Sequence, residues 1–352
     1  MLKRIDYLDG CRGVAIILVI LFHAFGRWPD LVPYGEYYAQ LSIVQYGWVG
    51  VELFFIISGF VIFMTLDKSE NYFSFIYKRW LRLFPAMLIV SIFIFLTAPF
   101  FYERPAGQPT LLSLLPGLIF TNPSPISKIF GVDIIVLEGA FWSLYIEFFF
   151  YLLSGALFFL IGKYNCWRVL TLIFLIACTA ATLSQGYYPF IFKVVMYFPF
   201  VYFGWFTAGA ALYFYHINNE NKWLYIGAIL LFCSSYFTSM LVIQGFVAMI
   251  CVSILFLISL KNQLLQSILQ WRPLLFLGFV SYPLYLLHEN MMISIIAKLA
   301  HQFGPHLGLL YFIAAIVFIL LISYAVAKWA EPLVKNLIKS IVKKLDMRNY
   351  FA

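Results

Sequence analysis

The segment from Tyr7 to Phe25, YLDGCRGVAIILVILFHAF, is apolar and long enough to cross a membrane, yet it carries a cation and an imidazole. Ten residues, all apolar or Gly, separate Arg12 from His23. On an α-helix eleven residues turn through about 1,100°, so both side chains lie on one face, roughly 16 Å apart along the axis. Ionisable groups at membrane depth are rare, so this arrangement favours a functional polar stripe over a snorkelling Arg and a structural His.

The composition indicates a polytopic membrane protein. Hydrophobic residues make up 64% of the chain and charged residues only 11%, whereas a soluble domain carries about 25% charged residues. The net charge of +8 is spread over short loops, which excludes a nucleic-acid-binding face and indicates a positive-inside bias. The five cysteines have no metal-ligand spacing and are expected to be small core residues.

The hydropathy pattern predicts an all-α membrane bundle of about ten transmembrane helices. The expected spans are 11–26, 46–66, 83–101, 139–161, 167–184, 191–215, 223–239, 242–260, 273–298 and 308–331. With the N-terminus in the cytoplasm, eighteen of the 23 Lys and Arg residues fall on the cytoplasmic side and five on the other. This imbalance predicts that both termini are cytoplasmic.

The chain divides into a transmembrane domain, 1–335, and a basic tail, 336–352. The tail spaces Ile, Val and Leu against Lys, so we expect an amphipathic helix bound to anionic membrane lipids. The longest segment on the other side, 102–138, contains Pro and Asn-Pro breaks. It is either a partly re-entrant loop that shapes a substrate entrance or a plain connector. The first span has no cleavage site after it and should remain in the protein.

Glu52 lies about six residues into the second span, at a depth similar to that of His23. A carboxylate at that depth should be paired. We therefore expect Glu52 to orient His23 and stabilise its protonated form, with pairing to a structural Arg as the alternative. The neighbouring Ser58-Gly59 indicates close helix packing or close approach of a ligand.

Arg79 and Arg82 are three residues apart and would share a helix face at the cytoplasmic mouth. Such a pair suits phosphate groups, although, taken alone, ordinary positive-inside decoration is the favoured explanation. Further along, Glu147 is a second carboxylate within a span, and it needs a distant partner.

Further polar side chains fall inside the fourth and ninth spans: Trp142, Ser143, His288 and Glu289. Pro283 can kink the ninth span. The group His23, Glu52, Glu147 and His288 has no HxxxH or HxxE spacing, so we expect no metal. Proton relay or acyl transfer is favoured instead.

Several motifs together resemble the acyltransferase-3 family of integral-membrane O-acyltransferases. LDGCRGVAIILVILFH, GVELFFIISGF, RWLRLFP, FWSLYIEFFFY, VSYPLYLLH and a closing EP occur in the family's order, over roughly residues 6 to 335. The resemblance implies a membrane acyltransferase domain that uses a cytoplasmic acyl-CoA donor, often acetyl-CoA. It also implies acceptor hydroxyls on sugars of O-antigen, exopolysaccharide, peptidoglycan or related glycans.

Position by position, Arg12 and His23 match the family's essential Arg/His pair. Glu52 stands where the family often has Asp, and Arg79 with Arg82 match the RxxR motif expected to meet CoA phosphates. The W-S-x-x-x-E stretch is matched by Trp142, Ser143 and Glu147. Many relatives carry an SGNH-type domain after the last span; this sequence ends soon after it, so transfer is expected within the membrane domain or with a separate partner.

These inferences combine into one expected mechanism. Arg79 and Arg82 hold the CoA phosphates, the pantetheine arm passes Arg12 and Ser58, and His23 is general base or transient acyl carrier. Glu52 and Glu147 assist His23. The residues expected beside the acceptor are Trp142, Ser143 and His288.

The expected location is the bacterial cytoplasmic (inner) membrane, and the expected acceptor is a glycan or lipid-linked saccharide. The alternative function is a proton-coupled transporter or flippase of an anionic or lipid-linked substrate.

Overall fold

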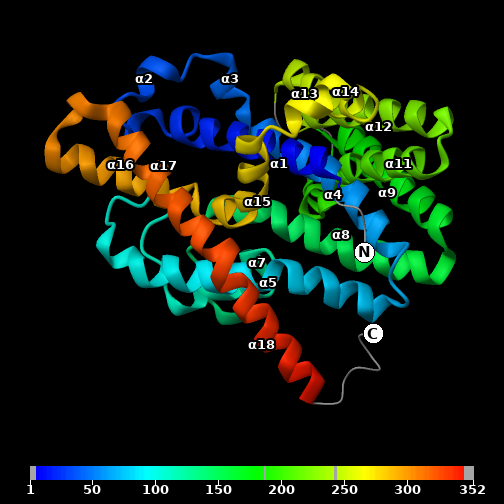
Figure 1. The fold of residues 1–352 in the computed structure, drawn as a ribbon, viewed down its shortest axis with the longest axis horizontal. Helices are drawn as coiled ribbons and strands as arrows, with labels where there is room; N and C mark the ends of the chain where they lie inside the picture. The colour runs from blue at the N-terminus through cyan, green and yellow to red at the C-terminus, as the bar shows by residue number, and fades with distance from the viewer. Residues whose placement is uncertain (1–4, 186–187, 242–243, 345–352) are drawn as a thin grey trace.

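The computed structural model describes residues 5–185, 188–241 and 244–344, and every regular element in these ranges is helical. The longer helices are α1 (Asp6–Leu21), α4 (Gly50–Leu66), α5 (Tyr72–Thr97), α8 (Trp142–Ile161), α9 (Lys163–Ser184), α11 (Phe203–Asn218), α12 (Asn221–Leu241), α13 (Phe246–Ser259), α15 (Arg272–Leu287), α16 (Asn290–Phe303), α17 (Gly308–Ala325) and α18 (Glu331–Lys344). They form one bundle, which α1 crosses near its middle (Figure 1).

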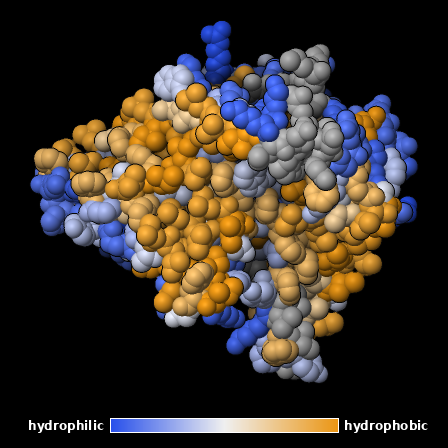
Figure 2. Space-filling view, turned by 90° about the horizontal axis from the view of Figure 1, so that it is seen from below, coloured by the Kyte–Doolittle hydropathy of each residue, from blue (hydrophilic) through white to orange (hydrophobic). Residues whose placement is uncertain are grey.

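The chain is a polytopic membrane helix bundle, as the sequence predicted. Within the described ranges, seven helices are long and apolar enough to cross a membrane, or eight if one bent pair forms a single span. Figure 2 shows hydrophobic residues over most of one face of the molecule, with hydrophilic residues at its margins. Such a surface suits contact with lipid rather than water.

Two of the ten expected spans, 191–215 and 273–298, are not single straight helices. Residues 191–215 form α10 (Pro189–Tyr197), the short turn η7 (Pro199–Tyr202) and α11. The expected span 242–260 begins at residues outside the described ranges and otherwise contains the single helix α13; a bend of 108° into α14 (Gln263–Leu269) follows it. The span 273–298 is divided between α15 and α16, and the break falls at His288 and Glu289.

Glycine allows α1 to pack unusually close to its neighbours. A Cβ atom added at Gly13 would lie 2.3 Å from the carbonyl oxygen of Leu274 on α15, and one at Gly50 of α4 would lie 2.3 Å from that of Ala15. Only glycine permits such a close approach of two backbones. The first helix is thereby fixed between α4 and α15.

A second close contact joins α4 to α11. A Cβ at Gly59 would lie 2.0 Å from the carbonyl oxygen of Phe206, and one at Gly209 would lie 2.0 Å from that of Ile56. The face of α4 that carries Ile56 and Gly59 is therefore turned toward α11, whereas Gly50 faces α1.

Two segments outside the central bundle bear on the sequence predictions. Residues 102–138 contain η5 (Leu111–Leu114), α6 (Leu115–Leu118) and α7 (Pro123–Phe130), helices too short to cross a membrane. The predicted boundary at residue 335 falls inside α18, and residues 345–352 of the predicted tail lie outside the described ranges.

Candidate active site

His23 lies where α1 changes its winding. The α-helix ends at Leu21 and continues as a π-helical turn, η1 (Phe22–Gly26). The His23 ring is buried, and its Nδ1 lies 2.9 Å from the carbonyl oxygen of Val19 and 3.1 Å from Nε2 of His288. Short π-helical turns of this kind often occur at functional sites.

The contacts of His288 determine which nitrogens carry protons when both rings are neutral. Nδ1 of His288 lies 2.7 Å from the carbonyl oxygen of Tyr285. A carbonyl only accepts hydrogen bonds, so this Nδ1 is the donor and Nε2 of His288 is an acceptor. His23 must then donate from Nδ1, both to His288 and to Val19, which leaves Nε2 of His23 unprotonated and able to act as a base.

Glu289 faces the unprotonated nitrogen of His23. Its Oε1 lies 3.8 Å from Nε2 of His23, and its Oε2 accepts a hydrogen bond from the backbone N–H of Ala140. Glu289 is only 6% exposed, so its charge is little screened by water. The carboxylate can stabilise the imidazolium that forms when Nε2 takes a proton.

The 102–138 loop holds the helix break beside Glu289. Glu138 accepts hydrogen bonds from the backbone N–H (2.6 Å) and side-chain Nδ2 (3.0 Å) of Asn290. Arg104 lies 3.8 Å from Glu138 and donates to the carbonyl oxygen of Leu137 at 2.6 Å. Burial raises the pKa of Glu138, and the charge of Arg104 opposes that rise. This loop is therefore part of the site and not a plain connector.

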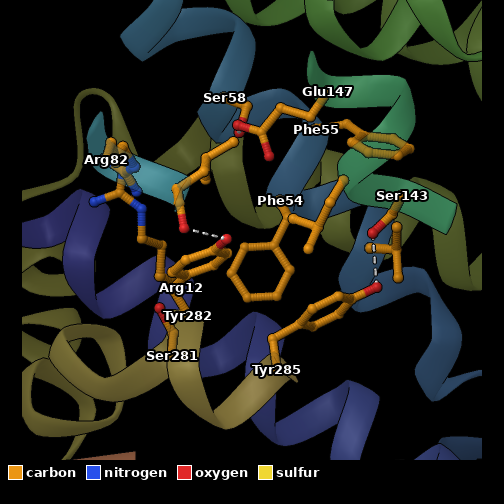
Figure 3. A pocket seen from close by; sticks show the side chains of 13 residues that line it. Arg12, Phe54, Phe55, Ser58, Arg82, Ser143, Glu147, Ser281, Tyr282 and Tyr285 are labelled. Atoms are coloured by element: carbon orange, nitrogen blue, oxygen red, sulfur yellow. Dashed lines mark hydrogen bonds between the residues drawn. The ribbon is translucent and has the colours of Figure 1, made fainter. Parts of the chain in front are cut away.

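A polar pocket lies next to this centre, between α1, α4, α5, α8 and α15. Its walls include Arg12, Phe54, Ser58, Arg82, Ser143, Glu147, Tyr282 and Tyr285. Figure 3 shows Arg12 and Arg82 on one side, Ser143 and Tyr285 on the other, and the Phe54 ring between them. We call the first group, with Glu147 and Ser58, the charged end and the second pair the hydroxyl end.

Three of the groups at the charged end, Arg12, Glu147 and Ser58, have defined partners. Arg12 pairs with Asp9 at 2.5 Å. Glu147 accepts hydrogen bonds from Ser58 at 2.8 Å and from the Tyr151 hydroxyl. These hydrogen bonds come from α4 and from the next turn of α8, and they supply the distant partner that Glu147 was expected to need.

The hydroxyl end connects the pocket to the histidines. The hydroxyl oxygens of Ser143 and Tyr285 are 2.7 Å apart, and both lie within hydrogen-bond distance of the Ala140 carbonyl oxygen. The Tyr285 ring is 5.2 Å from that of His288, centre to centre. The backbone of Ala140 thus links the pocket to the histidine centre. Its N–H donates a hydrogen bond to Glu289, and its carbonyl oxygen lies within hydrogen-bond distance of the two hydroxyls.

The predicted pairing of Glu52 with His23 is wrong. Glu52, Ile56 and Gly59 share a face of α4, since they are four and seven residues apart, and that face is turned toward α11. Gly50, which contacts α1, is two residues away and points to the opposite side. Glu52 is buried, and its Oε2 has no hydrogen-bond partner among the described residues. The sequence placed Glu52 in the second span but did not reveal which side of α4 it occupies.

The structure also separates Arg79 from Arg82. Arg82 lines the pocket, whereas the buried Arg79 donates to the carbonyl oxygen of Val61 at 2.9 Å and lies over the Tyr151 ring. Trp142 likewise lies outside the pocket lining, beside the rings of Phe55 and Tyr202. Arg12 lines the pocket, and His23 faces His288.

Sequence reasoning missed several residues of the site: Arg104, Glu138, Tyr282, Tyr285 and Asn290. A signal for two of them was present, because Tyr282, Tyr285 and His288 follow one another at intervals of three, which places them on one side of a helix. Glu138 and Arg104 gave no such signal. Within the described ranges, no group of three or more His, Cys, Asp or Glu side chains is arranged to hold a metal ion.

The fold and the site define a polytopic membrane protein with a buried acid–base centre beside a polar pocket. Residues 5–328 match the family model described as an acyltransferase domain, and the chain belongs to this acyltransferase-3 family. No solved structure matches the chain.

Two curated relatives are similar to it. Over 346 residues the chain is 25% identical to the peptidoglycan O-acetyltransferase OatA of Listeria monocytogenes serovar 1/2a, which covers 81% of this chain and 49% of that protein. Over 164 residues it is 26% identical to the O-acetyl transferase of Shigella phage Sf6, which covers 44% of this chain and 46% of that protein. The chain spans about half the length of these relatives.

Proposed function

We propose that this membrane acyltransferase moves an acetyl or other short acyl group from acyl-CoA to a sugar hydroxyl of a cell-surface glycan. The observation that carries the proposal is the arrangement of the charged end, the hydroxyl end and the unprotonated Nε2 of His23. The relatives' names support an acetyl group, and one of them names peptidoglycan as its acceptor.

The charged end suits the donor. Arg82 and Arg12 present two guanidinium groups, which bind phosphate through charge-assisted hydrogen bonds. Acetyl-CoA supplies phosphates for this end and an activated thioester for the reaction. The apolar wall around Phe54 suits a pantetheine arm, which would then lie between the charged end and the hydroxyl end.

His23 is the general base in this proposal. Its Nε2 takes the proton of the acceptor hydroxyl while the hydroxyl oxygen bonds to the thioester carbon. The C–S bond breaks, and the imidazolium returns the proton to the sulfur, so that CoA leaves as a thiol. His288 fixes the His23 ring by accepting from Nδ1, and Glu289 stabilises the imidazolium between the two proton transfers.

The separation of His23 and Glu289 suits an acceptor oxygen between them. Nε2 of His23 and Oε1 of Glu289 are 3.8 Å apart, too far for a direct hydrogen bond. An oxygen about 2.8 Å from each atom would complete a triangle with them, so a sugar hydroxyl fits beside both. A neighbouring hydroxyl of the same sugar could donate to Glu289.

CoA release tests the proposal. Purified wild type, His23→Ala and His301→Ala would be compared in nanodiscs with acetyl-CoA and a panel of bacterial glycans. We expect glycan-stimulated release from wild type and His301→Ala, whose histidine is exposed, and a loss of at least about 10³-fold in His23→Ala. A folded wild type that neither binds nor cleaves acetyl-CoA would contradict the proposal and favour a transporter.

A further inference from the structure

Tyr285 occupies the junction between the donor pocket and the histidines. Its ring lines the pocket beside Phe54, 5.9 Å between centroids, and its other side is next to His288. Its hydroxyl lies at the hydroxyl end, 2.7 Å from Ser143 and 3.0 Å from the Ala140 carbonyl oxygen. The tyrosine therefore contacts both halves of the site.

The hydroxyl end has one more hydrogen-bond donor than the Ala140 carbonyl requires. Ser143 and Tyr285 have two hydroxyl protons between them, and both reach the same Ala140 carbonyl, Ser143 at 3.2 Å. When Ser143 donates to that carbonyl, the Tyr285 proton can turn to another acceptor, and no buried polar group loses its partner.

The other hydroxyls on α15 differ in this respect. Tyr282 donates to the carbonyl oxygen of Leu83 at 2.9 Å and Ser281 to that of Gly278 at 2.8 Å. No second hydroxyl from the described part of the chain contacts either carbonyl, so neither proton can turn away without loss. The spare donor is specific to the Tyr285 position.

We propose that Tyr285 is a catalytic residue that donates a hydrogen bond to the thioester carbonyl oxygen of the bound acyl donor. This inference rests on the proposed function. As the acceptor oxygen bonds to the carbonyl carbon, negative charge develops on the carbonyl oxygen, and a positioned donor in a buried site stabilises that charge. Tyr285 keeps its proton throughout, while His23 carries the proton from the acceptor to the thiolate.

Two measurements test this role. In steady-state assays, Tyr285→Phe should lower kcat by about 10²-fold with less than about threefold change in the KM for acetyl-CoA. Ser143→Ala should give a smaller loss of kcat. Of the two hydroxyls, that of Tyr285 alone then remains to donate a hydrogen bond to the Ala140 carbonyl oxygen. The matched control is Tyr311→Phe, which removes a buried tyrosine hydroxyl that also donates to a backbone carbonyl, that of Gly304, outside the pocket.

Infrared difference spectroscopy with carbonyl-¹³C acetyl-CoA detects the hydrogen bond from Tyr285 to the thioester carbonyl directly, and it requires no glycan acceptor. The bound thioester band should lie below that of free acetyl-CoA in wild type and Tyr311→Phe, and return toward the free position in Tyr285→Phe. Identical bands in wild type and Tyr285→Phe, with normal turnover, would overturn the inference alone. If Tyr285→Phe does not fold, an unshifted band in wild type and in Ser143→Ala would also overturn it. Absence of any bound band in folded wild type would overturn the proposed function itself.

Discussion

Glu52 and Glu289 are both buried carboxylates of the bundle, but they differ in their surroundings. Glu52 lies in the first turn of α4, and its Oε2 has no hydrogen-bond partner among the described residues. Glu289 lies at the break between α15 and α16 and faces the first turn before α8, where the N–H of Ala140 is free to donate. Helix breaks supply the backbone donors that a buried carboxylate needs.

The two carboxylates also differ in their position relative to His23. Glu289 is 3.8 Å from Nε2 of His23, whereas Glu52 is on the α11 side of α4. We therefore expect substitutions near the break to affect chemistry, those of the arginines at the charged end to affect donor binding, and those at Glu52 to affect turnover least.

The largest effect is expected for Glu289→Gln. This change removes a charge close to the imidazolium, and two charges about 4 Å apart interact by about 4 kcal/mol at an effective dielectric constant of about 20. We expect kcat to fall by about 10²- to 10³-fold, with little change in the KM for acetyl-CoA, in a CoA-release assay. A variant within threefold of wild type would remove Glu289 from the mechanism.

Arg82→Ala should act on binding instead. Loss of a charge-assisted hydrogen bond to phosphate costs about 1.5–3 kcal/mol, so the KM for acetyl-CoA should rise by about 10- to 100-fold. The matched variant is Arg79→Ala, three residues earlier and outside the pocket, which should lower thermal stability more than it raises this KM. Equal increases in KM would mean that both arginines meet the donor.

Asn290→Ala should have an intermediate effect on chemistry. It removes the side-chain hydrogen bonds to Glu138 and to the Ala106 N–H, which hold the helix break next to Glu289. One such bond contributes about 1 kcal/mol, so we expect kcat to fall by about 5- to 20-fold while the donor KM stays unchanged. Asn290→Asp keeps an acceptor for Ala106 but faces the Glu138 carboxylate, so it should not restore kcat.

Glu52→Gln should have the smallest effect, within about threefold of wild type in kcat. The amide fills nearly the same volume, and the carboxylate it replaces has no contact with His23 within ion-pair distance. Side-by-side kcat measurements with Glu289→Gln check this order directly. A larger loss in Glu52→Gln than in Glu289→Gln would reverse the comparison.

The parts of the fold that were predictable are those in regular helices. The apolar run between Arg12 and His23 predicted α1, and the W-S-x-x-x-E stretch predicted that Ser143 and Glu147 share a helix with Trp142. Ser58, Arg82, Ser143 and Glu147 do meet in one pocket with Arg12. Periodicity sufficed here because each residue lies on an unbroken helix.

The rest could not be predicted because it depends on helix rotation and on breaks. His23 lies in the π-helical turn Phe22–Gly26, which the apolar pattern of the first span did not indicate. The partner of His23 comes from a break 265 residues further along the chain, and Glu138 contacts Asn290 across 152 residues. No local pattern encodes contacts between such distant segments.

The most direct test of the central claim is the protonation of the His23 ring. Nitrogen-15 NMR of histidine-labelled protein in nanodiscs, assigned with His23→Gln and His288→Gln, distinguishes the two ring nitrogens. We expect neutral His23 and His288 both to carry their proton on Nδ1, which leaves Nε2 of His23 free as the base. A proton on Nε2 of neutral His23 would rule out this nitrogen as the general base.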